Sequence, residues 1–230
     1  MKKIGIIAAM DKEAEGLKAA VENAKVKKVG GIEFFCGNIG EKEVVVARCG
    51  VGKVFAAMCA QTMILEFSPD CIINTGIAGG LDERLHILDA VVAESVVQHD
   101  MDTSPIGDPV GMISGINVIE INSDPDVSKT LMAAAQSCGV KCLSGIVATG
   151  DIFISTDEQR ERIKRVFGAH CAEMEGGAVG QVCYVNRVPF GIIRTISDNY
   201  KSDVSMDYPT FAVKAADASV RLAVEFVRII

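Results

Sequence analysis

The sequence predicts an α/β fold in which helices cover both faces of a mixed, mainly parallel β-sheet. Short apolar runs rich in Ile and Val alternate along the chain with longer segments whose apolar residues recur at helical spacing, an order typical of α/β proteins. Several of these runs are apolar on both faces. Strands of that kind are buried between two layers of helices.

Each run is assigned to an element by its length and periodicity. The expected strands are 3–9, 32–39, 43–49, 71–75, 90–97, 141–148 and 190–197. The expected helices are 11–21, 53–67, 125–138, 157–167, 176–186 and 210–229. Asp124 and Thr156 are predicted N-caps, and Pro125 suits a first helical position. Gly40 and Glu41 predict a hairpin turn between two strands, so the sheet is expected to be mixed.

The chain length predicts one domain, 1–230, with a continuous core. A chain of 230 residues buries about 70% of the surface that its unfolded form exposes. We find no internal repeat or linker composition. Residues 99–115 are rich in Gly, Pro, Asp and Ser and are long for a connection. Loops of this length commonly act as lids or subunit contacts.

Charge and hydropathy restrict the partners. The formal net charge of −7 disfavours nucleic acid and anionic membranes as partners and leaves small molecules as the expected ligands. The apolar run near the N-terminus is followed by Asp11, Glu13 and Glu15 without a cleavage site, so we expect a strand there and not a signal peptide. No apolar stretch reaches the roughly 18 residues of a membrane span. We therefore expect a cytoplasmic protein.

The cysteines and histidines do not form a recognisable metal or disulfide pattern. None of the eight cysteines belongs to a C-x-x-C pair, and five lie inside apolar segments. Reduced, buried thiols are therefore expected. Of the three histidines only His99 has acidic neighbours, Asp100 and Asp102. This short run predicts a polar loop, and no metal site is expected.

Two glycine clusters resemble nucleotide-binding motifs but do not match them. Gly50 to Lys53 resembles the end of a P-loop, yet Ala47 stands where the first glycine belongs and Val54 where Ser or Thr would hold magnesium. In the segment 75–80, TGIAGG, the glycines do not fall at the dinucleotide-binding positions. No cofactor is expected. Both segments offer backbone that a ligand can approach closely, because glycine has no Cβ.

Acidic residues at strand ends indicate the functional site, since ligands of open α/β sheets bind beyond the carboxyl ends of the strands. Glu13 follows the first strand, Glu175 follows the apolar run 171–174, and Asp198 ends the run that contains Arg194. Period-two alternation places Arg194 and Asp198 on one face of the strand and Ser197 on the other. Three carboxylates far apart in sequence are thus expected at one rim of the sheet.

Each of these residues also has a purely structural interpretation. Glu13 and Glu175 lie in or before the first turn of a helix, where a carboxylate favours the helix dipole. Arg194 and Asp198 would form a buried ion pair that serves only the scaffold. Their convergence on one rim favours a site over these separate roles.

Six segments resemble the bacterial 5'-methylthioadenosine/S-adenosylhomocysteine nucleosidases. They are GIIAAMDKEAE (5–15), CGVGK (49–53), INTGIAGGL (73–81), TGDIFI (149–154), EMEGGAV (173–179) and VPFGIIRTISD (188–198). The resemblance runs in order from Ile4 to Phe211. It implies the nucleoside phosphorylase superfamily fold, a single three-layer α/β/α sandwich, which is usually a homodimer without metal or cofactor.

The resemblance also implies roles for the acidic residues. Glu13 would be the general base that activates water, and Asp198 the acid that protonates or hydrogen-bonds adenine N7. Glu175 and Met174 would hold the ribose hydroxyls. Ser197, beside Asp198, is placed among the substrate-binding residues.

Further residues would shape the pocket on the same pattern. Phe153 would stack on the adenine ring while the backbone of Ile154 reads its edge, and Gly79 and Arg194 would complete the water site. Ile77 stands where many relatives have Ser, which removes a hydroxyl near the nucleophile. The ribose face and the 5'-alkylthio pocket would be lined by Met10, Val51, Tyr208 and the 99–115 loop of a neighbouring subunit.

The chemistry requires groups of this kind. Adenine is a poor leaving group as an anion, so Asp198 must be protonated, and burial at an apolar strand end raises the pKa of a carboxyl group. The carboxylate of Glu175 would stabilise the oxocarbenium-like ribose, while Glu13 takes a proton from attacking water. Glu13 and Asp198 are therefore expected to lie far enough apart to admit a sugar and a water.

The predicted reaction is hydrolysis of the N-glycosidic bond of 5'-methylthioadenosine and S-adenosylhomocysteine, which releases adenine and a 5-alkylthioribose for methionine salvage. One alternative is a purine nucleoside phosphorylase, for which Arg48 and Arg84 are the candidate phosphate ligands. Another is a nucleoside-binding protein without catalysis. The preferred 5' substituent is left open among methylthio, homocysteinyl, deoxy and futalosine-type nucleosides.

Overall fold

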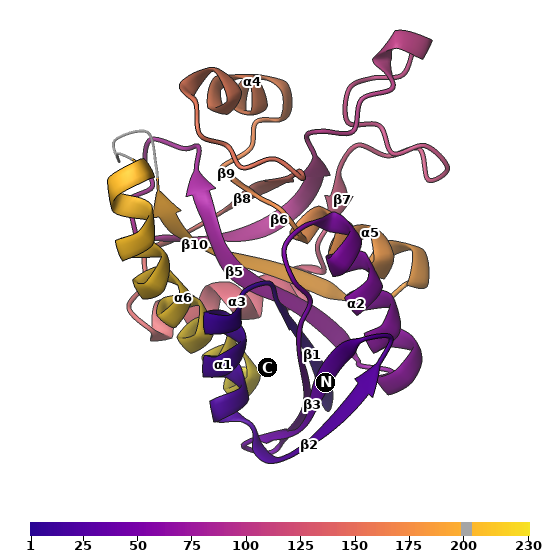
Figure 1. Cartoon of the computed structure of the whole chain (residues 1–230), viewed down its shortest axis with the longest axis vertical. Helices are drawn as coiled ribbons and strands as arrows, with labels where there is room; N and C mark the ends of the chain where they lie inside the picture. The colour runs from indigo at the N-terminus through magenta and orange to yellow at the C-terminus, as the bar shows by residue number, and fades with distance from the viewer. Residues whose placement is uncertain (199–203) are drawn as a thin grey trace.

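The computed structural model, which describes residues 1–198 and 204–230, the side chains of 204–210 excepted, has an α/β architecture (Figure 1). Its strands are β1 (Lys3–Ala8), β2 (Glu22–Val29), β3 (Ile32–Ile39), β4 (Lys42–Arg48), β5 (Cys71–Gly80), β6 (Ala90–Gln98), β7 (Ile121–Asn122), β8 (Cys142–Thr149), β9 (Cys171–Glu173) and β10 (Phe190–Asp198). Its α-helices are α1 (Asp11–Ala20), α2 (Lys53–Phe67), α3 (Pro125–Ser137), α4 (Asp157–Phe167), α5 (Gly176–Asn186) and α6 (Val204–Ile229).

The strands form one mixed sheet in the order β10-β6-β8-β9-β5-β1-β4-β3-β2, with β7 paired to β6. Parallel pairs link β1 to β4 and β5, β10 to β5, and β6 to β8. The β3–β4 pair is antiparallel, as the predicted hairpin requires. Strand β10 also pairs with β5, so β5, β10, β6, β8 and β9 close into a ring. The sequence did not predict this closure.

Helices cover both faces of the sheet, as predicted (Figure 1). Alternation along β1 explains how: Ile6 packs into the cluster that contains Leu17 of α1 and Phe226 of α6, whereas Ile7 packs into the cluster that contains Met63 of α2. Helix α3 joins α1 and α6 on the first face, and α5 joins α2 on the second. Strands that are apolar on both sides are stable only between two such layers.

Most of the predicted elements are present, with small shifts at their ends. The helices at 53–67, 157–167 and 176–186 have the predicted bounds. Asp124 accepts hydrogen bonds from two backbone N–H groups of α3, and Thr156 forms a capping box with Gln159. Both predicted N-caps are therefore confirmed.

Four features differ from the prediction. Strand β2 was missed because nearly all its residues are exposed and polar, and the short strands β7 and β9 have too few residues for a periodic signal. Strand β5 continues past Thr75 to Gly80. Helix α6 begins at Val204, whereas the sequence predicted Thr210. The residues that follow Thr75 are paired into the ladder with β10 and β9.

The predicted long connection projects from the body of the protein (Figure 1). It contains only a short 3-10 helix, Ser104–Ile106, and the side chain of Ile106 is 82% exposed. Within residues 1–198 and 204–230, no helix combines the length and apolar character needed to cross a bilayer.

Candidate active site

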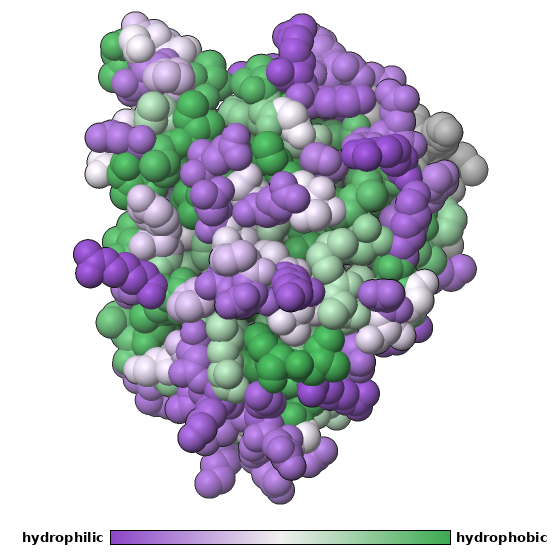
Figure 2. All heavy atoms as spheres, turned by 180° about the vertical axis from the view of Figure 1, so that it is seen from behind, coloured by the Kyte–Doolittle hydropathy of each residue, from purple (hydrophilic) through white to green (hydrophobic). Residues whose placement is uncertain are grey.

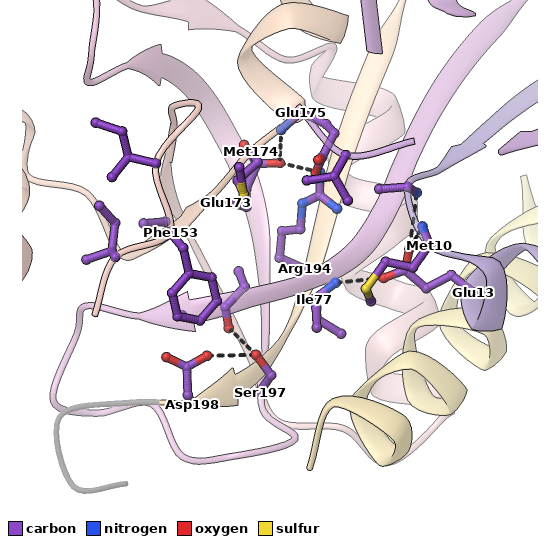
Figure 3. Close-up of a pocket in the computed structure, with 17 residues that line it drawn as sticks. Met10, Glu13, Ile77, Phe153, Glu173, Met174, Glu175, Arg194, Ser197 and Asp198 are labelled. Atoms are coloured by element: carbon purple, nitrogen blue, oxygen red, sulfur yellow. Dashed lines mark hydrogen bonds and ion pairs between the residues drawn. The ribbon is translucent and has the colours of Figure 1, made fainter. Parts of the chain in front are cut away.

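A pocket lies at the carboxyl ends of β1, β5, β9 and β10, the rim that the sequence indicated (Figure 3). It contains about 620 Å³ of empty space, part of it open to solvent. The predicted site residues that line it are Met10, Glu13, Val51, Gly79, Phe153, Ile154, Met174, Glu175, Arg194, Ser197 and Asp198. Tyr208, also predicted, lies outside the residues whose side chains are described.

Glu13 is held at one end of the pocket by three backbone N–H groups. Its Oε2 accepts hydrogen bonds from Ala9 (3.1 Å) and Met10 (3.0 Å), and its Oε1 accepts one from Ile77 (3.2 Å). The bond from Met10 caps the start of α1. Glu13 therefore has the helix-capping role that the sequence suggested, and it also lines the pocket. The third bond shows that residue 77 serves Glu13 through its backbone, even though Ile lacks a hydroxyl.

The pKa of Glu13 is higher in the folded protein than in water. Its side chain is buried, and burial raises its pKa, although the N–H of Met10 and the charge of Arg194 oppose the shift. A carboxylate with a raised pKa is a stronger base toward water. Glu13 is thus suited to accept a proton from a water molecule in the pocket.

Arg194 is fully buried among carboxylates in the middle of the pocket wall. Its guanidinium hydrogen-bonds Glu173 and Asn74 and lies 3.7 Å from Oε2 of Glu175. The predicted structural alternative, an Arg194–Asp198 ion pair, is therefore wrong. Burial disfavours the charged guanidinium, but the carboxylates outweigh burial and the pKa of Arg194 lies above its usual value.

Glu173 was not predicted, yet it organises this part of the site. Besides pairing with Arg194, its Oε2 accepts hydrogen bonds from the backbone N–H of Glu175 (3.0 Å) and Gly176 (2.7 Å) at the start of α5. Its Oε1 accepts from Thr149 at the end of β8. Glu173 thereby fixes the backbone of the residue that follows it in the pocket. The EMEGG motif contained this residue, but the three-residue strand β9 offered no alternation to show which way it points.

Glu175 turns its carboxylate toward α2. Its Oε1 accepts a hydrogen bond from the N–H of Gly52 (2.9 Å), and it makes no side-chain cap to α5, the helix that it precedes. The sequence had suggested that Glu175 interacts with the dipole of α5, but its side chain does not cap that helix. Burial and then repulsion from Glu173 raise the pKa of Glu175 to about 7, against the charge of Arg194.

Asp198 lies at the other end of the pocket with partners of its own. Its Oδ1 accepts a hydrogen bond from Ser197 Oγ (2.8 Å), and its Oδ2 lies 3.4 Å from Nη2 of Arg160 in α4. Burial raises its pKa, while Ser197 and Arg160 oppose this shift. Arg160 is almost fully buried and was not predicted, because the polar sequence around it suggested an exposed helix.

A β-bulge explains why Ser197 and Asp198 both reach the pocket. The register of β10 against β5 shifts between Ile196 and Asp198, and a bulge re-aims the side chains that follow it. The predicted alternation, with Ser197 on the opposite face from Asp198, is therefore wrong at this point.

Two glycines of β5 allow the charged groups to approach the backbone. A Cβ at Gly79 would lie 3.2 Å from Oδ2 of Asp198. A Cβ at Gly76 would overlap the guanidinium of Arg194 and lie 2.9 Å from Oε1 of Glu13. The resemblance had placed Gly79 with Arg194 at the water site. In the structure Gly79 lies beside Asp198, and the glycine that lies beside Arg194 and Glu13 is Gly76.

Most of the remaining lining residues are apolar, and some of them are exposed at the mouth of the pocket. Phe153 and Val51 are 46% and 52% exposed, and Met10 and Met174 are partly buried. Figure 3 shows the ring of Phe153 between Met174 and Asp198. A flat apolar group could stack there with its polar edge toward Asp198.

Within the described part of the chain, no group of three or more His, Cys, Asp or Glu side chains is placed to hold a metal ion. All eight cysteines are free thiols, and burial raises the pKa of Cys49, which lies two residues from the lining residue Val51.

The comparisons with known proteins agree with this geometry. The family model described as "Phosphorylase superfamily" matches residues 3–228. The chain therefore belongs to the phosphorylase superfamily, which confirms the resemblance and the fold that the sequence suggested.

Within this superfamily the similar proteins are nucleosidases. A 5'-methylthioadenosine/S-adenosylhomocysteine nucleosidase of Shewanella sp. (strain W3-18-1) is 39% identical over 93% of each chain. The crystal structure of the nucleosidase of that name from Neisseria meningitidis, in complex with methylthio-immucillin-A, has a TM-score of 0.94 and 32% identity over 100% of both chains. A futalosine hydrolase of Helicobacter pylori strain 26695 has the same TM-score and identity, over 100% of this chain and 98% of that one.

The buried arginine leads to a first prediction. Arg194→Met should lower the free energy of unfolding at pH 7 by about 3–5 kcal/mol, because it leaves buried carboxylates without their cation. In the variant those carboxylates should have higher pKa values in the folded state than in the unfolded state, so folding takes up protons. The free energy of unfolding of the variant should therefore rise again as the pH falls from about 7 to 5.5. Urea unfolding at both pH values measures this.

Arg48→Met is the matched control. The ion pair of Arg48 with Asp11 (3.1 Å) is exposed, and its loss should cost less than about 1 kcal/mol at either pH. An Arg194→Met variant as stable as this control would show that the buried pair does not hold the site together.

Proposed function

We propose that the protein hydrolyses the N-glycosidic bond of 5'-methylthioadenosine and S-adenosylhomocysteine and releases adenine and the 5-alkylthioribose. The observation that carries the proposal is the placement of Glu13 and Asp198, two buried carboxyl groups with raised pKa values, on opposite sides of one pocket (Figure 3). Glu175 and Arg194 lie between them. The relatives named as nucleosidases support the same assignment.

Asp198 is the proposed acid at the purine. With adenine stacked on Phe153, the carboxyl group of Asp198 reaches the N7 side of the ring and donates its proton as the C1'–N9 bond breaks. The bonding electrons then stay on a neutral base. Ser197 orients the carboxyl group through its 2.8 Å hydrogen bond, and the backbone of Ile154 borders the edge of the base.

Glu175 is the proposed partner of the ribose. Positive charge develops on the sugar as the bond breaks, and a preorganised carboxylate stabilises that charge in a site shielded from water. Arg194 and Glu173 keep Glu175 in place from behind. Met174 and Met10 pack against the sugar and its 5' substituent.

Glu13 is the proposed base. It takes a proton from a water molecule that attacks C1' on the face opposite adenine, and the hydroxide forms the new C1'–O bond. Its three backbone hydrogen bonds hold the carboxylate while the proton arrives. Ile77, which lines this end of the pocket, supplies no side-chain donor to a larger anion.

The surroundings of the candidate phosphate ligands favour hydrolysis over phosphorolysis. Arg48 pairs with Asp11 and Arg84 pairs with Asp82, and neither arginine lines the pocket. Arg194 does line it, but its charge is already compensated by Glu173 and Glu175. A phosphate dianion would therefore meet excess negative charge.

The reaction is tested by measuring adenine release with and without phosphate. We expect the same rate in both conditions for 5'-methylthioadenosine, and measurable release from S-adenosylhomocysteine; 5'-deoxyadenosine and a futalosine-type nucleoside complete the panel. Asp198→Asn is the control variant, expected to bind nucleoside within about tenfold of the wild type and to lose at least about 100-fold in kcat. Strict dependence on phosphate would reverse the assignment, and binding without release by the wild type would indicate a non-catalytic protein.

Arg160 provides a test of the acid through pH. In the wild type, kcat/KM should fall at low pH as Glu13 and Glu175 become protonated, and at high pH as Asp198 loses its proton. Because the charge of Arg160 lowers the pKa of Asp198, Arg160→Met should raise that pKa and move the alkaline limb to higher pH. Arg160→Lys, which keeps the charge, should leave the limb near its wild-type position. An unmoved limb in Arg160→Met would show that another group is the acid.

The proposal extends to a homodimer in the cytoplasm. Helices α2 and α5 expose large apolar side chains, among them Phe55 (54%), Met58 (48%) and Val185 (60%), and Figure 2 shows hydrophobic side chains along the edge that these helices form. Val51, which lines the pocket and is 52% exposed, lies two residues before α2. A second copy seated on this face would bring its 99–115 loop to the 5' end of the pocket.

Compartment and pathway are proposed from chemistry. Eight free thiols suit a reducing compartment such as the cytoplasm. The product 5-methylthioribose keeps the methylthio group of methionine, which supports a role in methionine salvage.

The dimer is tested by sedimentation. We expect the wild type to have twice the 24.4 kDa mass of the chain and Met58→Glu to shift to the monomer mass, because a charge in an apolar interface is costly. Val26→Glu, an exposed position on β2 (57%), is the control and should stay dimeric. A monomeric wild type at micromolar concentration would refute the dimer.

A further inference from the structure

Three segments meet beside the pocket in a ring of polar contacts that the mechanism above does not use. The ammonium of Lys53, the first residue of α2, pairs with Oδ1 of Asp100 at 2.7 Å. Oδ2 of Asp100 accepts a hydrogen bond from the N–H of Asp151 (2.9 Å), and Oδ1 of Asp151 accepts one from the N–H of Lys53 (2.8 Å). The ring is thus closed, and none of its three residues lines the pocket.

Both ends of this Lys53–Asp100–Asp151 ring are joined to the pocket by adjacent residues. Asp151 precedes the lining residues Phe153 and Ile154. Gly52, which precedes Lys53, donates its N–H to Oε1 of Glu175 (2.9 Å). The ring therefore connects the loop proposed to contact the base with the carboxylate proposed to contact the ribose.

The backbone at Gly52 brings the two sides of the ring close together. Gly52 has φ 101°, and a Cβ there would lie 2.9 Å from Oδ1 of Asp151. At the start of α2 the carboxylate of Asp151 also lies at the positive end of the helix dipole. A displacement of Asp151 would therefore act on Gly52 and, through it, on Glu175.

The ion pair at the centre of the ring is shielded from solvent. The side chains of Lys53 and Asp100 are only 20% and 16% exposed, and Lys53 has a second acceptor in Oε1 of Gln98 at 3.2 Å. A shielded pair with several hydrogen bonds holds its geometry better than an exposed pair does.

We propose that Lys53 and Asp100 are positioning residues that set the spacing between the loop at Phe153 and the carboxylate of Glu175, and so determine how tightly the nucleoside binds. This inference rests on the proposed function. Arg194 and Glu173 still hold the carboxylate of Glu175 when the ring is broken, so the change falls on the loop at Phe153 and on its distance from Glu175. The contacts of this loop to the base exist in the ground state and in the transition state alike, so a loss of the spacing raises KM more than it lowers kcat. A displacement of about 1 Å is enough to matter at a site of this kind.

Kinetics of paired variants test the proposal. Lys53→Met and Asp100→Asn are each expected to raise KM about tenfold while kcat stays within about threefold. The double variant should be no worse than either single variant, because both remove the same interaction. Lys53→Arg, which can still reach Asp100, should recover most of the affinity.

A matched control separates positioning from general stability. Lys27→Met removes the exposed Lys27–Glu66 pair (2.8 Å) and should leave KM and kcat unchanged, with thermal midpoints recorded for every variant. Additive losses in the double variant, or a fall in kcat at unchanged KM, would overturn the proposal. Should Lys53→Met not fold, Asp100→Asn, which removes the charge at nearly the same volume, decides the outcome.

Hydrogen exchange provides a readout that does not depend on activity. In the ligand-free protein, the amides of residues 150–156 should exchange about tenfold faster in Lys53→Met than in the wild type, and at the wild-type rate in Lys27→Met. If the wild type released no adenine, the proposed function would fail while this measurement still tested the ring. Unchanged exchange in that segment would show that the ring does not hold the loop.

Discussion

The burial of one guanidinium among carboxylates is the constraint on which the site depends. A charged side chain can leave water only if opposite charge and hydrogen bonds replace its hydration, and Arg194 receives both from Glu173, with Asn74 and Glu175 beside it. These partners come from β5, β9 and the start of α5. The need to satisfy Arg194 therefore draws together segments that are distant in sequence, and the pocket forms in front of them.

The charge balance that results fits the proposed chemistry. One arginine faces the carboxylates of Glu173, Glu175 and Glu13, so this end of the pocket is negative, and burial together with repulsion from Glu173 raises the pKa of Glu175. Such a field stabilises a sugar that becomes cationic, and it opposes the entry of an anionic nucleophile. Asp198 lies outside this cluster with Arg160 and so can hold a proton independently of it.

Sequence periodicity predicted most of the elements because their strands are buried on two sides and their helices on one. It could not show β2, which is polar and exposed, or the direction of Glu173, which lies in a strand of three residues. Strand-end carboxylates pointed to the pocket because the topology of parallel sheets brings those ends together.

Other features of the site depend on tertiary contacts with no local signal. Arg160 lies in a segment of charged residues typical of an exposed helix face, and only the packing of α4 over Asp198 buries it. Alternation failed at Ser197 because the bulge that follows Ile196 adds a residue to one strand. The ring through Lys53 joins three segments whose spacing in the sequence has no period.

Because β5, β10, β6, β8 and β9 close on one another, the two ends of the pocket differ in how firmly the backbone of β10 is held. At Arg194, β10 is paired on both sides, because this residue lies opposite Gly76 of β5 and Val91 of β6. The backbone that carries the guanidinium therefore cannot shift without breaking hydrogen bonds to both strands. Beyond the bulge, Asp198 is paired to β5 alone, opposite Gly79. The end that we propose to contact the sugar is therefore held by strands on both sides, whereas the end that we propose to contact the base is held by one strand. Adenine would then leave through a local movement of the second end, with the charged cluster unchanged.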